Sequence, residues 1–283
     1  MVDKNLFLYD LAVVTIMKID GPYVKEWLDY HLLAGVDHFY IYDNESVDEY
    51  RDVIKPYVER GIVTSIPTDV WIAGVPAYND SVKNFRFQSR YIAFIDSDEF
   101  IFPKKNRSIV EVLDNLFSNN PNAGTVSVNW QCFGSNGQEK ADYTRGVLER
   151  FTRRAKDSWY SPPDGARTEW IGNIHVKNIS NPRKINFFRS PHFPDCFAGV
   201  STIDDNSKVV SSSFIKLPIT INTLVLNHYY TKSHEEFLKR RPASSGQRSK
   251  FFPLYDRNEV FDDGIIKYRD ARRDALIGKG GGY

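Results

Sequence analysis

Three acidic side chains directly follow an apolar segment of the sequence. Residues 91–95 (YIAFI) are typical of a buried β-strand, and Asp96, Asp98 and Glu99 come immediately after it. Open α/β sheets bind ligands at the carboxyl ends of their strands. Asp96 and Asp98 are spaced to bind one divalent cation, which also takes oxygen ligands from a diphosphate. The segment therefore predicts a site for a metal ion and a nucleotide-diphosphate sugar.

Other interpretations of this acidic segment stay open. The carboxylates can simply cap a turn or face solvent. Haloacid-dehalogenase-type phosphatases also end a strand in Asp-x-Asp and use the first Asp as the nucleophile, but Phe100 stands where they have Thr or Val. A non-catalytic carbohydrate-binding protein would use the aromatic residues of the chain and need no metal.

Composition indicates a globular α/β protein. The chain has 283 residues, 41% hydrophobic and 14% aromatic, which is enough for a substantial core. A net charge of +1 argues against binding nucleic acid through bulk charge. Two cysteines without metal-ligand spacing indicate a reducing compartment. The apolar segment 11–17 is too short to span a membrane, so we expect a cytoplasmic protein whose membrane contacts are peripheral.

The first half of the sequence alternates between strand and helix patterns. Val24, Trp27, Leu28, His31 and Leu32 recur on one face of a helix that Gly35 can end. The other expected elements are strands at 11–17, 38–42 and 62–66, and helices at 48–59, 76–90 and 108–116. Consecutive β-α-β units with short loops predict a parallel sheet.

The second half predicts shorter strands separated by long polar loops. The expected strands are 125–130, 146–151, 174–176 and 223–226. The loop 157–172 carries Trp159, Tyr160 and Trp170, which can form a platform for a sugar or anchor the loop. We divide the chain into a domain at 1–238, with a nucleotide-sugar half at 1–120 and an acceptor half at 121–238, and a charged extension at 239–283.

Five segments, in order along nearly the whole chain, resemble one enzyme family. They are MKIDGPYVKEWLDYHLLAGVDHFYIYDNES (17–46), YIAFIDSDEF (91–100), NWQCFGSNG (129–137), VLERF (147–151) and NHYYTKSHEEF (227–237). Together they resemble glycosyltransferase family 92 and the glycosyltransferase 2-like group. The resemblance implies a GT-A fold with a mixed, mostly parallel sheet, a nucleotide-diphosphate sugar donor, Mn²⁺ or Mg²⁺, and inversion at the anomeric carbon. This chain has Lys18, Ile19 and Asp20 where the family usually has Lys-Asn-Glu, so the identity of the donor is the least certain property to carry over from the family.

Residues at the ends of the first two strands are candidates for binding the donor. Thr15 and Lys18 end the first strand, and Asp43 and Asn44 end the second, where a nucleoside would rest. A carboxylate accepts the imide proton of uracil, although Asp43 and Asn44 can equally form a turn. Lys177 matches the family's pattern of Lys and Pro before His192, and either steadies the leaving diphosphate or lies on the solvated surface.

The third metal ligand and the catalytic base lie in the second half. His228 resembles the distant histidine that completes the metal shell of many GT-A enzymes, here with Asp96 and Asp98; a lone histidine is otherwise structural. An inverting transfer needs a base, for which Glu149 is the first candidate and Asp195 the second. A salt bridge to a neighbouring arginine is an equal alternative for Glu149.

The sequence thus predicts a metal-dependent inverting hexosyltransferase of polysaccharide biosynthesis. The expected donor is UDP-linked, with UDP-galactose as one candidate, and the acceptor is a hydroxyl of a polysaccharide, glycolipid or glycoprotein. The sequence does not specify the acceptor, the linkage, the sugar or the oligomeric state.

Overall fold

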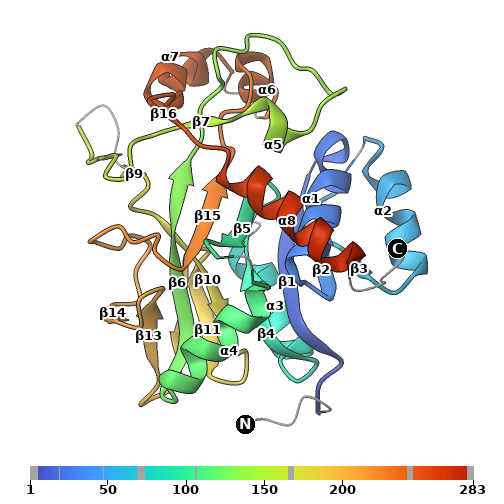
Figure 1. The fold of residues 1–283 in the computed structure, drawn as a ribbon, viewed down its shortest axis with the longest axis vertical. Coiled ribbons are helices and arrows are strands. Elements are labelled where there is room, and N and C mark those ends of the chain that lie inside the picture. The colour runs from blue at the N-terminus through green and yellow to red at the C-terminus, as the bar shows by residue number, and fades with distance from the viewer. Residues whose placement is uncertain are drawn as a thin grey trace.

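A mixed β-sheet with helices on both faces forms the body of the molecule (Figure 1). The structure is a computed structural model that describes residues 6–18, 20–46, 48–68, 74–105, 107–164, 169–240 and 245–278. The predicted α/β class is confirmed. Within the described ranges, no helix is long and apolar enough to cross a bilayer.

The N-terminal half of the sheet is parallel, as predicted. Its strands are β1 (Tyr9–Met17), β2 (His38–Asp43), β3 (Val63–Pro67) and β4 (Ser89–Phe94), arranged in the order β4-β1-β2-β3. Met17 lies opposite Asp43, and Val14 lies opposite Phe94. The carboxyl ends of three neighbouring strands therefore meet along one edge of the sheet.

Strands from the second half extend this sheet and make it mixed. β10 (Val176–Ser180) runs antiparallel between β4 and β6 (Ala123–Cys132). β15 (Leu224–His228) lies parallel to β6 and antiparallel to β5 (Glu99–Pro103). The remaining strands are β13 (Ser201–Asp204) and β14 (Val209–Val210) beyond β6, and the small pairs β11 (Ile185–Ser190) with β12 (Phe193–Cys196), β7 (Arg153–Arg154) with β16 (Val260–Phe261), and β8 (Tyr160–Ser161) with β9 (Ile171–Gly172).

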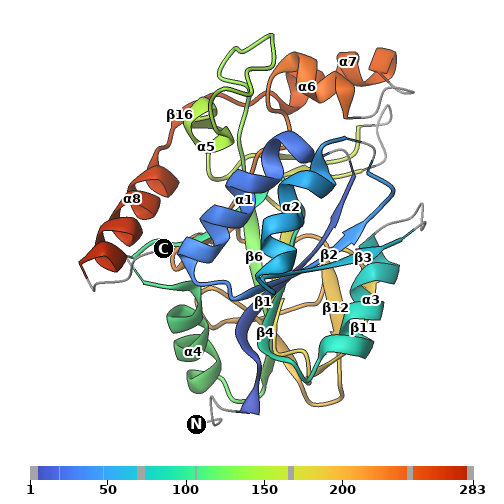
Figure 2. The same ribbon diagram turned by 90° about the vertical axis from the view of Figure 1, so that its right-hand side faces the viewer.

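Each face of the sheet has its own hydrophobic core, because alternate side chains of a strand point to opposite faces. Leu11, Val13 and Met17 pack toward α1 (Gly21–Ala34), α2 (Tyr50–Glu59), α4 (Ile109–Asn119) and α8 (Gly264–Ile277). Ala12 and Val14 pack toward α3 (Gly74–Phe85) and β11. Figure 2 shows α8 and α4 on one side of the sheet and α3 with β11 on the other.

Three predicted elements differ from the structure. Residues 146–151 are not a strand: Val147–Arg150 form the short helix α5, because the Glu26 carboxylate of α1 accepts N–H hydrogen bonds from Val147 (2.5 Å) and Leu148 (3.2 Å). The predicted helix 76–90 ends at Phe85, since β4 begins at Ser89. The predicted strand 174–176 is displaced to Val176–Ser180.

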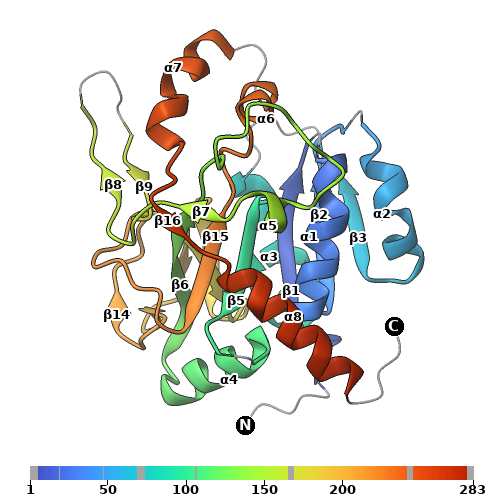
Figure 3. The same cartoon turned by 45° about the horizontal axis from the view of Figure 1, so that its top comes forward.

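The described part of the predicted extension 239–283 packs closely on the rest of the chain. α6 (His234–Lys239) and α7 (Ser245–Tyr255) lie beyond the carboxyl edge of the sheet (Figures 1 and 3). β16 pairs with β7, and Ile265 and Tyr268 of α8 belong to the same core as α1. Residues of this segment are therefore available to the site described next.

Candidate active site

A cavity of about 660 Å³ opens beyond the ends of β6 and β15, and its size suits a small organic ligand. Its wall is largely aromatic, with Trp130, Phe133, Trp170, Phe214, Tyr230 and Tyr255. The Trp130 ring contacts three histidines of the same wall, with centroid distances of 4.1 Å to His228, 4.9 Å to His175 and 5.4 Å to His192. Packed flat rings of this kind suit the apolar face of a sugar.

Asp98 and His228 meet at the edge of this cavity. Antiparallel pairing of β5 and β15 puts His228 opposite Glu99, and the Tyr229 N–H donates to the Asp98 carbonyl at 2.9 Å. His228 Nε2 then lies 3.5 Å from Asp98 Oδ2, to which Arg240 also forms an ion pair. Burial raises the pKa of Asp98, but Arg240 and His228 outweigh this effect and hold it well below its usual value.

Asp96 is paired with Lys177 instead. The Lys177 ammonium lies 2.9 Å from Asp96 Oδ1, and its side chain is 2% exposed, against 42% for Asp96. The Tyr78 hydroxyl donates to the same oxygen at 3.4 Å. Burial raises the pKa of Asp96, but Lys177 outweighs it, so the net pKa is lowered. Lys177 thus keeps this carboxylate ionised at the sheet edge.

Glu99 fixes the geometry of the acidic turn. Its side chain is fully buried, and Oε2 accepts the Asp96 N–H at 2.7 Å while lying 3.9 Å from the Lys177 ammonium. Burial raises the pKa of Glu99 well above its usual value, although Lys177 opposes the shift. This carboxyl group orients its neighbours and does not face the cavity.

The donor set fits a divalent cation in part. Two ligands at about 2.1 Å from one ion and at right angles to each other lie about 3 Å apart, close to the 3.5 Å between Asp98 and His228. Asp98 Oδ1 and His228 Nδ1 are buried and have no hydrogen-bond partner among the described residues. In the part of the chain described, no group of three such side chains is assembled, because Asp96 turns to Lys177. One or two carboxylates plus substrate phosphates are a common shell for Mg²⁺.

The predicted nucleoside residues lie at the ends of β1 and β2. Thr15 is fully buried, and its Oγ1 has no hydrogen-bond partner in the part of the chain that the structure describes. Asp43 accepts the Ser46 N–H at 2.9 Å and pairs with Arg51 at 3.1 Å, so both of its oxygens have protein partners. The other two predicted residues are Asn44, which is buried, and Lys18, which is exposed.

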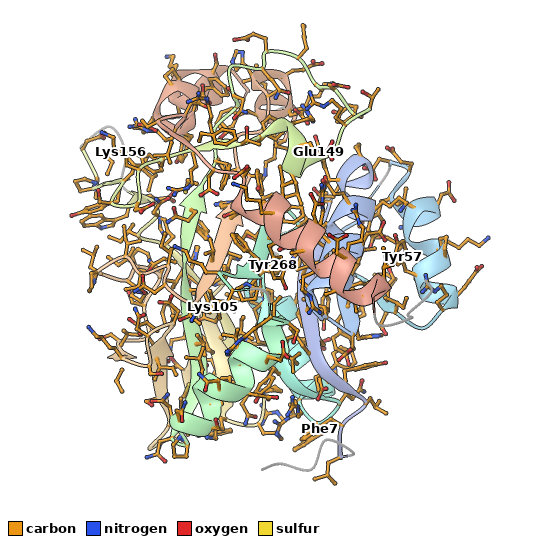
Figure 4. The ribbon with its side chains drawn as sticks, in the orientation of Figure 1. Phe7, Tyr57, Lys105, Glu149, Lys156 and Tyr268 are labelled. Carbon is orange, nitrogen blue, oxygen red and sulfur yellow. The ribbon has the colours of Figure 1, made fainter. Side chains whose placement is uncertain are left out.

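The two predicted bases are not brought to the cavity. Glu149 lies on α5, where Arg269 of α8 approaches it at 3.4 Å (Figure 4). Asp195 lies on β12 and pairs with Arg189 of β11. Neither residue is among the described residues that line the 660 Å³ cavity, whereas His228 lines it and Asp98 lies 3.5 Å from His228.

Four charged residues that sequence reasoning did not select belong to this region. Glu169 lines the cavity, and Arg240 pairs with Asp98. Lys232 and Asp20 are coupled electrostatically to Asp98 and Arg240. Asp20 and Lys232 lie within the family-like segments and were therefore detectable, whereas no pattern in the sequence marked Glu169 or Arg240.

The structure thus has an acidic turn at the carboxyl edge of an α/β sheet, where open sheets of this kind bind their ligands, and an aromatic cavity beside it. The family model of glycosyltransferase family 92 matches residues 20–260, and the chain belongs to this family. This confirms both the predicted resemblance and the GT-A fold class.

Individual relatives are distant. A glycosyltransferase family 92 protein of Ricinus communis is 25% identical over 147 residues, covering 52% of this chain and 26% of that protein. The galactan β-1,4-galactosyltransferase GALS2 of Arabidopsis thaliana is 30% identical over 103 residues, covering 33% of this chain and 20% of that protein. TarS 1–349 of S. aureus superposes with a TM-score of 0.42 at 12% identity, covering 86% of this chain and 70% of that one. The chain thus matches less than a third of the length of either plant protein.

Proposed function

We propose that this chain transfers a hexose from a UDP-sugar, with UDP-galactose as the first candidate, to a glycan hydroxyl, using a divalent cation and inverting the anomeric centre. The observation that carries the proposal is the contact between Asp98 and His228 at the edge of the aromatic cavity. Membership of family 92 supports a sugar transferase over a haloacid-dehalogenase-type phosphatase or a non-catalytic carbohydrate-binding protein. The Arabidopsis relative, named as a galactan galactosyltransferase, supports galactose and a polysaccharide acceptor.

The proposed donor site uses the edge where β1, β2 and β4 end. Asp98 and His228, with Asp96 as the proposed third ligand, would hold a cation, which would supply the positive charge that neutralises the diphosphate and helps it leave. Lys177 keeps Asp96 ionised and adds a positive charge beside the diphosphate. Thr15 and Asp43 remain the candidates for contacts to the nucleoside.

The proposed acceptor lies against the aromatic wall, on the side away from the diphosphate. A single displacement requires a base that removes the proton of the attacking hydroxyl. We assign this role to Glu169, because it is the only carboxylate in the described part of the cavity wall. Glu149 and Asp195 are kept as alternatives and as comparison variants.

The direct test is a donor panel with and without Mn²⁺. UDP-galactose, UDP-glucose, UDP-N-acetylglucosamine and GDP-mannose are each incubated with the chain and with β-1,4-galactan oligosaccharides. We expect Mn²⁺-dependent release of UDP and a β-linked product by NMR. An α-linked product would contradict the single displacement, and release of inorganic phosphate from these donors or from a phosphomonoester would favour the phosphatase.

A further inference from the structure

Arg240 occupies the position at which a cation would bind Asp98. It directly follows α6, and its Nη1 forms an ion pair with Oδ2, the same Asp98 oxygen that faces His228 Nε2. Its guanidinium also lies over the ring of Tyr230, with 4.9 Å between the guanidinium carbon and the ring centroid. Tyr230 lines the cavity, so the guanidinium stands at the cavity's edge.

This ion pair satisfies a charge that is otherwise costly to bury. The Asp98 side chain is 2% exposed, and a buried carboxylate requires a positive partner. Lys232 is a second nearby cation, but it is buried and packs over the Tyr23 ring at 4.4 Å. Among the described residues, it forms no ion pair with Asp98. Arg240 therefore provides the charge that a divalent cation would provide in the loaded site.

Arg240 and a divalent cation compete for the same oxygen. Two positive charges on Asp98 Oδ2 would repel each other strongly in this buried setting. The Arg240 side chain is 36% exposed, so it has room to leave. Guanidinium groups bind phosphate through two parallel hydrogen bonds, and a diphosphate arriving with the cation would provide such a partner close by.

We propose that Arg240 is a donor-binding residue that pairs with Asp98 before the donor binds and moves its guanidinium to the diphosphate when cation and nucleotide bind. This inference rests on the proposed function. Arg240 would then pair with two negatively charged groups in turn: with Asp98 before the donor binds, and with the diphosphate afterwards. Its signature is that removing the side chain changes the affinities for cation and nucleotide in opposite directions.

The experiment measures two affinities of the full chain. Mn²⁺ alone is titrated by electron paramagnetic resonance, and UDP is titrated by calorimetry with Mn²⁺ saturating. For Arg240→Ala we expect Mn²⁺ to bind more tightly, because the competitor is gone. We expect UDP to bind about 10- to 150-fold more weakly, as for a lost hydrogen bond to a charged group. Arg240→Lys keeps a charge, so its Mn²⁺ affinity stays near wild type while UDP affinity falls in part.

The matched control is Lys239→Ala, because Lys239 is the exposed neighbour that pairs with Glu235. It should change neither affinity. Parallel losses of both affinities in Arg240→Ala and in Arg240→Lys would show a structural role and overturn the inference, as would unchanged UDP binding. If the wild-type chain binds Mn²⁺ and UDP normally, those outcomes refute only this inference. If the wild type binds neither, the proposed function fails as well.

Discussion

Replacing Glu236 by glutamine tests how strongly the contacts of Glu236 with α5 and α1 stabilise α6 beside the site. Glu236 accepts two hydrogen bonds from Arg150 of α5, at 3.0 and 2.6 Å, and one from the Tyr23 hydroxyl of α1 at 2.7 Å. It also completes a capping box with Ser233 at the start of α6. The side chains of Arg150 and Glu236 are 1% and 2% exposed. This pair thus ties α6, which lies between Lys232 and Arg240 in the chain, to α5.

The size of the effect follows from the pKa of Glu236. Burial raises this pKa, but Arg150, Ser233 and Tyr23 outweigh it and lower the pKa from 4.5 to about 2. A shift of this size corresponds to about 3 kcal/mol of folding free energy at neutral pH. Because the folded pKa is depressed, the contribution is complete above the unfolded pKa and disappears as the pH falls toward 2. At pH 3, about 2 kcal/mol is already lost.

Urea denaturation of the wild type and of Glu236→Gln, at pH 7 and at pH 3, measures the contribution of Glu236 to the free energy of unfolding at each pH. We expect the variant to be less stable by about 3 kcal/mol at pH 7, since it leaves Arg150 buried without a counter-charge, and by only about 1 kcal/mol at pH 3. Glu235→Gln, one residue earlier and partly exposed, is the comparison; Lys239 and the Ala141 N–H also lower the pKa of Glu235, so this variant should show a pH dependence of the same sign but smaller. An equal stability difference at both pH values would refute the argument.

Three further predictions concern the active site. Asp98→Ala should abolish Mn²⁺-dependent binding of UDP in calorimetry, and unchanged binding would exclude a metal bridge through Asp98. His228→Ala should weaken Mn²⁺ binding by about 1.5 to 3 kcal/mol while thermal stability holds; normal Mn²⁺ affinity, or an unfolded variant, would indicate a structural histidine. Glu169→Gln should keep donor binding but slow transfer about 10²- to 10⁴-fold, whereas Glu149→Gln should not; the reverse result in the transfer assay would return the base to Glu149.

The parallel half of the sheet could be predicted because its signals are local. Alternating patterns of strand and helix, with short loops between them, leave few topologies open. Gly35 ends α1 in the left-handed conformation (φ 102°), and Ser108 with Glu111 forms a capping box at the start of α4. The acidic turn after β4 was likewise visible, because it follows an apolar strand directly.

The strand predicted at 146–151 shows where local signals fail. Val147 and Leu148 suit a strand, but Glu26, about 120 residues earlier, accepts their N–H groups and stabilises a helical turn. Because Glu149 lies on α5, its side chain lies near Arg269 of α8 and not at the cavity. No pattern within residues 146–151 indicates that a residue as distant in sequence as Glu26 accepts their hydrogen bonds.

The sequence by itself determined the α/β class, the family and the acidic turn, since the class and the turn depend on local patterns and the family on short segments in a fixed order along the chain. Only the tertiary structure decided which charges face one another. Asp98 meets Arg240 across 142 positions, and Asp96 turns to Lys177 instead of joining Asp98 and His228. Such pairings follow from the order and direction of β10 and β15 within the sheet, and electrostatic energy depends on distances in space and not on separation along the chain.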